Sequence, residues 1–241
     1  MEYNVYCDES CHLVSNDSKY MLIGAVYCPK SKVKKVLAQL ACVVFLLICG
    51  LLIFFNLSHE YHIVSGTSMV PTLNVDGTTD GVFVSKIKHY NRGDIIVAKS
   101  GEIDEATNEE KIVIKRLIAI GGDKITVREV DGVNRIFIIY RDSEEETMLD
   151  EPYLQDYSVN SDLKKRFTDM VKNCDLSQDA QGYITIAGDD IFYLGDNRKV
   201  SKDCATYGPK NKKNVVGLVD YIAYGNKYIY WQVIKQFFGG K

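Results

Sequence analysis

Two serines and one lysine lie in stretches whose residue types suit hydrolytic chemistry. Ser68 lies in Ser-Gly-Thr-Ser-Met-Val-Pro-Thr-Leu at residues 65–73, Lys115 in an apolar stretch at residues 112–120, and Ser201 in Gly-Asp-Asn-Arg-Lys-Val-Ser-Lys-Asp at residues 195–203. A serine hydroxyl is a weak nucleophile until a neighbouring base takes its proton. None of the histidines forms a convincing Ser-His-Asp arrangement: His12, His59, His62 and His89. Lys115 is therefore the candidate base.

Lys115 can act as a base only where its neutral amine is favoured. An exposed lysine has a pKa of about 10.4 and is protonated at neutral pH. Lys115 is flanked by apolar residues, namely Val113, Ile114, Leu117 and Ile118. Burial among such side chains disfavours the ammonium form and lowers the pKa of a lysine. The alternative is an ordinary strand lysine whose amine reaches solvent.

These three stretches occur in the same order in bacterial type I signal peptidases, and the chain resembles that family over residues 36–236. The resemblance implies a membrane-bound serine endopeptidase that cleaves signal peptides from exported preproteins. It implies that Ser68 is the nucleophile, that Lys115 is the general base and that the Ser201 hydroxyl orients the lysine amine. Further residues receive supporting roles (Gly66, Asp196, Asn197, Arg198 and Asp203) or shape the substrate cleft (Met69 and Pro71). The expected partners are signal peptides and the lipid bilayer, and no metal or cofactor is expected.

Several positions depart from the family pattern. The resemblance places an asparagine before Ser201 and a serine and an arginine after Asp203, where this chain has Val200, Cys204 and Ala205. The familiar Leu-Pro-Gly-Asp after the lysine segment is Ile-Gly-Gly-Asp at residues 120–123. We expect the ion pair from Asp203 to the missing arginine to be lost unless Lys202 or Arg198 replaces it.

The oxyanion site also differs from that of some relatives. The Ser68 backbone N–H is expected to hold part of the negative charge that develops on the attacked carbonyl oxygen. Some relatives add a side-chain hydroxyl two residues before the nucleophile, where this chain has Gly66. A backbone group would have to replace that donor.

An uncharged run at residues 36–57 predicts a membrane span. A helix of 22 residues is about 33 Å long, which is enough for a hydrocarbon core of about 30 Å. A cleaved signal peptide would have a shorter apolar region and a small-residue cleavage site. Basic residues lie directly before the run, at Lys30, Lys32, Lys34 and Lys35. The positive-inside rule then places the N-terminus in the cytoplasm and residues 58–241 outside.

Beyond the span the pattern predicts a mainly β fold, a signal-peptidase-type β-sheet or barrel domain with a small inserted cap region at about residues 141–187. Turn residues separate short strand candidates at residues 81–86, 94–98, 112–120, 124–129, 135–140, 183–187, 191–194, 215–224 and 228–233. Residues 160–173 predict a helix whose apolar face is Leu163, Phe167, Met170 and Val171. Residues 151–157 resemble a short extended segment of the one-span branch of the family.

The first 35 residues lie outside the peptidase pattern. Strand-like residues 3–8, a polar turn at 14–19 and a second strand at 20–27 predict a cytoplasmic hairpin before the basic segment. This hairpin resembles the first hairpin of an RNase H-like domain of unknown function, in which Asp8 would bind metal. The favoured interpretation is a tail without chemistry, because a metal site needs further ligands that the following span does not supply.

Composition narrows the alternatives. The net charge of -3 gives no electrostatic case for nucleic-acid binding. Seven scattered cysteines describe neither a disulfide framework nor a zinc site. A self-cleaving repressor would share the Ser/Lys dyad but needs an N-terminal DNA-binding domain in place of the span. A catalytically inactive membrane adaptor with a peptide-binding β domain is the non-enzyme alternative.

Overall fold

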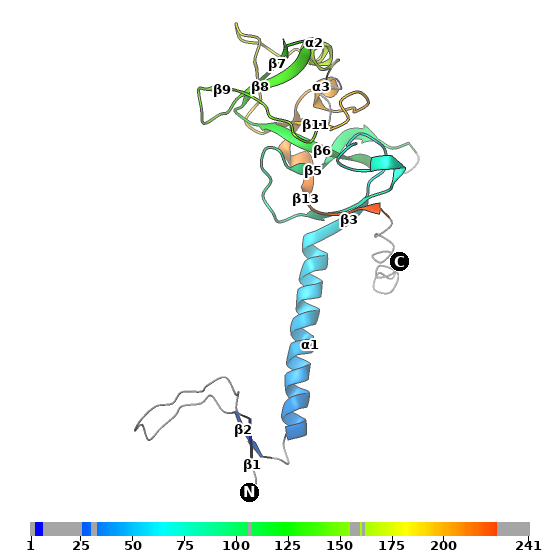
Figure 1. Cartoon of the computed structure of the whole chain (residues 1–241), viewed down its shortest axis with the longest axis vertical. Helices are drawn as coiled ribbons and strands as arrows, with labels where there is room; N and C mark the ends of the chain where they lie inside the picture. The colour runs from blue at the N-terminus through cyan, green and yellow to red at the C-terminus, as the bar shows by residue number, and fades with distance from the viewer. Residues whose placement is uncertain are drawn as a thin grey trace, which may run out of the picture. The chain divides into compact units, whose positions relative to one another are not determined.

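The computed structural model describes residues 3–6, 26–29, 33–105, 108–154, 160 and 162–225 of the 241-residue chain. The chain divides into two units, Met1–Leu57 and Ser58–Lys241. The first unit contains a strand pair and a long helix, and the second contains two larger sheets and shorter helices (Figure 1).

The N-terminal strand pair consists of β1 (Tyr3–Tyr6) and β2 (Val26–Pro29), which run antiparallel. The expected pairing of two N-terminal strands is confirmed, and β2 continues beyond the predicted end at residue 27, whereas residues 20–25 lie outside the described residues. Asp8 lies outside the described residues, as do Cys7, Cys11 and the expected turn at residues 14–19.

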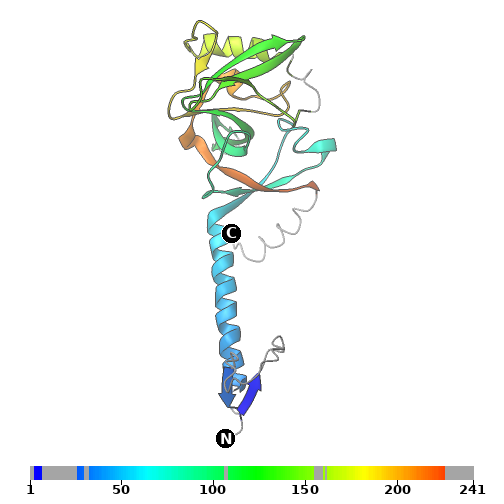
Figure 2. The same ribbon diagram turned by 60° about the vertical axis from the view of Figure 1, so that its left-hand side comes forward.

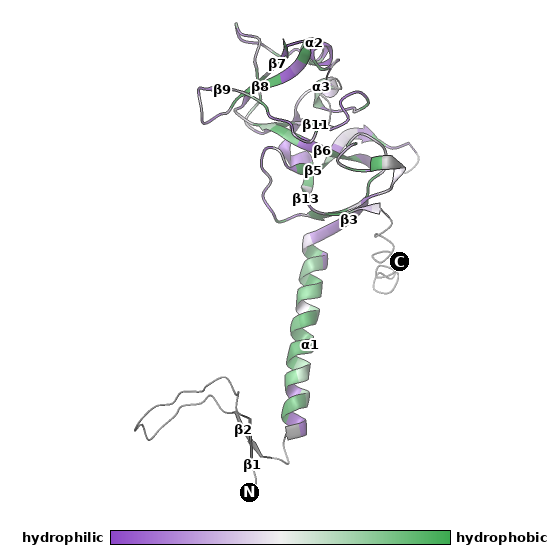
Figure 3. Ribbon diagram, viewed as in Figure 1, coloured by the Kyte–Doolittle hydropathy of each residue, from purple (hydrophilic) through white to green (hydrophobic). Residues whose placement is uncertain are grey.

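Helix α1 (Val33–Ser58) contains the predicted span and extends it at both ends. Its side chains over residues 34–57 are exposed apart from the half-buried Cys49. Figure 3 shows the helix as hydrophobic along most of its length. Within the described part of the chain it is the one helix long and apolar enough to cross a membrane, and an 18-residue window within Lys34–Ser58 has a mean hydropathy of 2.9. A helix that is apolar on all sides and satisfies its own backbone hydrogen bonds suits the interior of a bilayer.

A sheet of seven antiparallel strands carries Lys115, and Ser68 lies in the segment between two of these strands, β3 and β4. The strand order is β12-β11-β6-β5-β13-β4-β3. The bounds are β3 (His59–Ile63), β4 (Gly81–Ser85), β5 (Ile95–Ile103), β6 (Glu110–Ile120), β11 (Asp190–Leu194), β12 (Lys210–Asn211) and β13 (Val215–Ala223). The C-terminal part of β6 is covered on both faces of the sheet, as the burial of the consecutive residues Leu117, Ile118 and Ala119 shows. This explains why the stretch around Lys115 is apolar without alternation.

A second sheet of four strands and a helix form the rest of this unit. The strands are β7 (Lys124–Val130), β8 (Val133–Ile139), β9 (Glu146–Met148) and β10 (Ile184–Thr185), in the order β10-β7-β8-β9. Helix α2 (Leu163–Asn173) lies beside this sheet (Figure 2). The four apolar residues expected on its inner face are buried in the main core. Phe167 packs edge-on against Phe192 of β11, so α2 connects the smaller sheet to the larger one.

The predicted strands from residue 81 onward are present with bounds shifted by a few residues, and the mainly β fold is confirmed. The sequence patterns missed β3, β9, β12, the short helix α3 (Cys204–Tyr207) and the 3-10 turns Val75–Gly77 and Lys212–Asn214. The strand expected at residues 228–233 lies outside the described residues.

Candidate active site

The segment after β3 folds into a turn that fixes Ser68. Met69 and Leu73 are buried in a cluster with four valines, Val64, Val82, Val84 and Val97. The Leu73 N–H donates to the Met69 carbonyl at 2.9 Å, and the Val70 N–H donates to the Thr67 carbonyl at 3.2 Å. The Val70–Pro71 peptide bond inside this turn is cis. Because Met69 is held in the core, its neighbour Ser68 remains half-buried at the edge of that core.

Asn74 closes this turn and was not singled out from the sequence. Its amide nitrogen donates to the carbonyl oxygens of Val64 at 2.8 Å and Gly66 at 2.9 Å. Asn74 and Asp80 also exchange two hydrogen bonds between backbone N–H groups and side chains, at 2.7 and 2.8 Å. Asn74 has a φ of 58°, a conformation that asparagine tolerates better than most residues. That tolerance, at a position between two apolar stretches, is the available sequence signal.

Lys115 lies on β6 and reaches Ser68 across 47 positions of sequence. Its side chain is 3% exposed. The Nζ atom is 2.8 Å from Ser68 Oγ and 3.0 Å from the Ile114 carbonyl oxygen. No carboxylate of the described residues forms a salt bridge with this amine. Serine hydroxyl and lysine amine therefore form a direct, shielded pair.

Burial lowers the pKa of the Lys115 amine below its ordinary value of 10.5. The negative charges of Asp203 and Asp196, and of Cys204 when ionised, act in the opposite direction. Desolvation is the larger effect, so the neutral amine is more populated here than in water. Burial raises the pKa of the Cys204 thiol, which is accordingly neutral at neutral pH.

The loop at residues 195–203 lies against the Ser68 turn. The Asn197 N–H donates to the Ser68 carbonyl at 3.0 Å, and the Asn197 side chain donates to the Thr67 carbonyl at 3.0 Å. A Cβ atom at Gly195 would lie 2.5 Å from the Ser68 carbonyl oxygen and 2.2 Å from Ser201 Oγ. Only glycine at position 195 permits this close approach of loop and turn.

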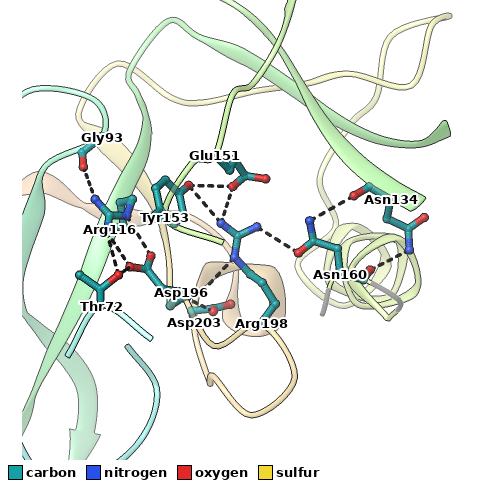
Figure 4. A network of polar contacts seen from close by, with 11 residues as sticks. Thr72, Gly93, Arg116, Asn134, Glu151, Tyr153, Asn160, Asp196, Arg198 and Asp203 are labelled. Atoms are coloured by element: carbon teal, nitrogen blue, oxygen red, sulfur yellow. Dashed lines mark hydrogen bonds and ion pairs between the residues drawn. The ribbon is translucent and has the colours of Figure 1, made fainter. Parts of the chain in front are cut away.

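A second contact to the turn runs through Asp196. Arg116, next to Lys115 on β6, donates to the two Asp196 carboxylate oxygens at 2.9 and 2.6 Å (Figure 4). The Thr72 hydroxyl donates to the same carboxylate at 2.5 Å. Asp196 is 1% exposed, so its charge depends on these partners. The carboxylate thus joins β6, the loop and the turn.

Arg198 is fully buried and carries the network toward the smaller sheet. It donates to Glu151 Oε1 at 2.5 Å and, through Nε, to the Gly195 carbonyl at 2.9 Å (Figure 4). Tyr153 donates to the same Glu151 oxygen at 2.7 Å, and its ring lies 3.9 Å from the Arg116 guanidinium carbon. Burial raises the pKa of the Tyr153 hydroxyl, which keeps this group a neutral donor.

Comparison with known proteins identifies the family. The sequence model of the family described as signal peptidase, peptidase S26, matches residues 33–224, which is most of the chain. The chain belongs to the signal peptidase family, peptidase S26.

Curated relatives agree with this family match. Signal peptidase I of Bacillus caldolyticus is 29% identical over 165 residues, which cover 66% of this chain and 76% of that protein. Signal peptidase I P of Bacillus subtilis subsp. natto is 30% identical over 176 residues, covering 71% of this chain and 80% of that protein. The crystal structure of a signal peptidase I from Enterococcus faecalis matches at 25% identity and a TM-score of 0.36, over 55% of this chain and 97% of that one.

The structure brings together the residues expected to form a signal peptidase site. Ser68 and Lys115 are in contact, and Ser201, Asn197 and Gly66 lie around the same turn. The expected hydrogen bond from Ser201 to Lys115 is not present among the described residues. Ser201 Oγ is buried and has no partner there, because the hydroxyl faces the Gly195 Cα and the Lys115 amine bonds the Ile114 carbonyl instead.

The expectation for Asp203 was wrong about its partner. Neither Lys202 nor Arg198 replaces the arginine that the resemblance places after this aspartate. Arg166 of α2 donates to Asp203 Oδ1 at 2.8 Å instead. The aspartate also accepts from the Gly195 N–H at 2.9 Å and from the Ala205 N–H at 3.1 Å, where it caps α3.

Gly66 explains the missing hydroxyl donor of this signal peptidase. Its φ is 90°, a conformation that residues with a side chain rarely adopt. A serine at this position would be strained even though its Cβ would meet no atom within 4 Å. The Ser68 backbone N–H makes no hydrogen bond within the described part of the chain.

Besides Asn74, five residues of the site were given no role from the sequence: Thr72, Arg116, Glu151, Tyr153 and Arg166. Thr72 and Arg116 lie inside stretches that the motifs already marked, so their positions were an available signal. Glu151 and Tyr153 lie in the segment that resembles the one-span branch of the family. No pattern in the sequence indicates that Arg166 belongs to the site, because a charged residue on an amphipathic helix ordinarily faces solvent.

Proposed function

We propose that this chain is a membrane-anchored type I signal peptidase in which Ser68 is the nucleophile and Lys115 the general base. The observation that carries the proposal is the 2.8 Å contact between Ser68 Oγ and a buried lysine amine that has no carboxylate partner among the described residues. Burial lowers the pKa of this lysine and favours its neutral amine, which is the form that can accept a proton from a hydroxyl.

The chemistry proceeds in two halves. The Lys115 lone pair takes the hydroxyl proton while Ser68 Oγ forms a bond to the carbonyl carbon at the cleavage site. The resulting ammonium then gives that proton to the leaving amine as the peptide bond breaks, which leaves an ester on Ser68. Water attacks the ester with Lys115 again as base, and the serine is regenerated.

The Ser68 N–H is the proposed oxyanion donor, since it is unpaired within the described residues and belongs to the nucleophile itself. Ser201 is proposed to orient the lysine amine. Its buried, unpaired hydroxyl supports this role, because leaving such a group without a partner costs about 1–3 kcal/mol. A bond to Lys115 in the substrate complex would remove that cost.

The proposed substrates are signal peptides of exported preproteins with small residues at the first and third positions before the cut. The proposed topology has the N-terminus in the cytoplasm and the peptidase unit outside, because Lys30, Lys32, Lys34 and Lys35 precede the span and no basic residue follows it until Lys86. The lipid bilayer is the expected partner of α1, whose exposed surface is apolar.

The test is cleavage of a preprotein by the full chain in detergent micelles. Ser68→Ala and Lys115→Ala should each abolish cleavage, because nucleophile and base act as one unit. Lys111→Ala is the matched control, since Lys111 is an exposed lysine on the same strand. Retention of most activity in Lys115→Ala would refute the dyad. A folded wild-type chain that binds preprotein without cutting it would support the inactive-adaptor alternative.

A further inference from the structure

Arg166 is the one residue of α2 that reaches the loop carrying Ser201 through several polar contacts. Its guanidinium donates to the carbonyl oxygens of Arg198 at 2.7 Å and Ser201 at 2.8 Å. It also donates to Asp203 Oδ1 at 2.8 Å and to the Thr206 hydroxyl at 3.0 Å. A planar guanidinium has donors in a fixed geometry that suits several acceptors at once. These contacts cover the loop from its middle to the start of α3.

The loop that Arg166 contacts is the one that supports Ser68. The Asp203 carboxylate uses its other oxygen to accept the Gly195 N–H. Gly195 packs against the Ser68 carbonyl and against Ser201 Oγ. A displacement of Asp203 would therefore move Gly195, and through Gly195 it would change the positions of Ser68 and Ser201.

The charges around Lys115 show a second feature. Two carboxylates act on the amine, Asp196 and Asp203, and both favour its ammonium form. Asp196 has its own arginine, Arg116, at 2.6 Å. Asp203 has Arg166 at 2.8 Å. The Cys204 thiol is the third group that acts on the amine, and burial keeps it neutral. Each of the two carboxylates that would oppose a neutral Lys115 is thus paired with an arginine.

We propose that Arg166 is a positioning residue of the Ser68–Lys115 site. It holds in place the loop at residues 195–203 and the start of α3, and it offsets the charge of Asp203. This inference rests on the proposed function, because that proposal assigns catalysis to Ser68 and Lys115. The contacts of Arg166 do not depend on it. The arginine comes from α2, inside the inserted cap region, so the insertion contributes to the site rather than only covering the core.

The experiment compares Arg166→Gln, Arg166→Lys and Lys165→Gln in the full chain in detergent. Lys165 is the matched control, because it is the adjacent cation on α2, its side chain is 80% exposed and it pairs only with Asp169 at the surface. The pH profile of preprotein cleavage and the hydrogen exchange of residues 195–206 are measured for each variant.

Arg166→Gln should move the rising limb of the pH profile to higher pH by about half a unit to one unit. The reason is that an uncompensated Asp203 stabilises the ammonium form of Lys115. At a pH below the limb, the rate should fall about three- to tenfold. Arg166→Lys keeps the charge but loses the planar donor geometry, so its limb should stay in place while residues 195–206 exchange faster. Lys165→Gln should match the wild type in both measurements.

A limb that does not move in Arg166→Gln would overturn the electrostatic role, whatever the change in rate. Unchanged exchange of residues 195–206 in Arg166→Lys would overturn the positioning role, and this measurement needs only a folded protein. Failure of the proposed function is a separate result: no cleavage by the wild type that depends on Ser68 and Lys115, with the exchange test still valid.

Discussion

The buried ion pair between Arg198 and Glu151 predicts a large loss of stability in Glu151→Gln. Both side chains are 0% exposed and their closest atoms are 2.5 Å apart. Glutamine keeps the shape of the side chain but leaves the guanidinium without a counter-charge. Breaking a buried pair in this way costs about 3–5 kcal/mol. For a domain of this size each kcal/mol lowers Tm by about 2–4 °C, so the expected drop is about 6–20 °C.

The assay is thermal unfolding of the full chain in detergent, followed by circular dichroism. Asp169→Asn is the control, because it breaks the exposed Lys165–Asp169 pair and should leave Tm almost unchanged. The double variant Glu151→Leu/Arg198→Met should recover part of the loss, since it removes both buried charges. A Tm change in Glu151→Gln no larger than that of the control would refute the reasoning.

Three further predictions concern the site and the anchor. Lys115→Met should abolish cleavage yet raise stability at neutral pH. Because burial lowers the pKa of Lys115, its contribution to the stability of the wild type is most favourable above pH 10.5 and becomes less favourable as the pH drops toward the folded-state pKa. The free energy of unfolding of the Met variant, measured against pH, should lack this slope. Preproteins with Leu or Phe at the first position before the cut should be cleaved far more slowly than those with Ala in a competition assay, and equal rates would contradict a small pocket. Deletion of residues 2–29 should preserve processing of an exported reporter in cells. Changing Lys30, Lys32, Lys34 and Lys35 to Glu should reduce processing, because the anchor would insert in the wrong orientation. A deletion variant that inserts correctly but does not process the reporter would show a role for the N-terminal hairpin.

Local patterns in the sequence were sufficient to predict the two longer helices. The apolar run at residues 36–57 predicts a helix of the observed kind, because length and the absence of charge are local properties. Leu163, Phe167, Met170 and Val171 repeat at helical spacing, so the buried face of α2 could be read directly. The short strands β9 and β12 could not, because each gains its identity from a neighbouring strand and has too few residues to show a period.

The candidate site was predictable only where a motif marks it. Ser68, Lys115 and Ser201 were found because the resemblance joins three separate stretches, and their roles in catalysis remain predictions. Residue types alone do not show that Ser68 and Lys115 lie 2.8 Å apart. The distance follows from the burial of Met69 and from the position of β6 in the larger sheet.

The sequence by itself determined the anchor, the β class and the residues able to do the chemistry. The tertiary structure decided which charges meet. Asp203 is paired with Arg166 across 37 positions, Arg198 with Glu151 across 47, and Asp196 with Arg116 across 80. Each of the three carboxylates is buried and must have a partner, but several arginines could have met that need. Only the packing of α2 and the two sheets brings one particular arginine within hydrogen-bonding distance of each acid.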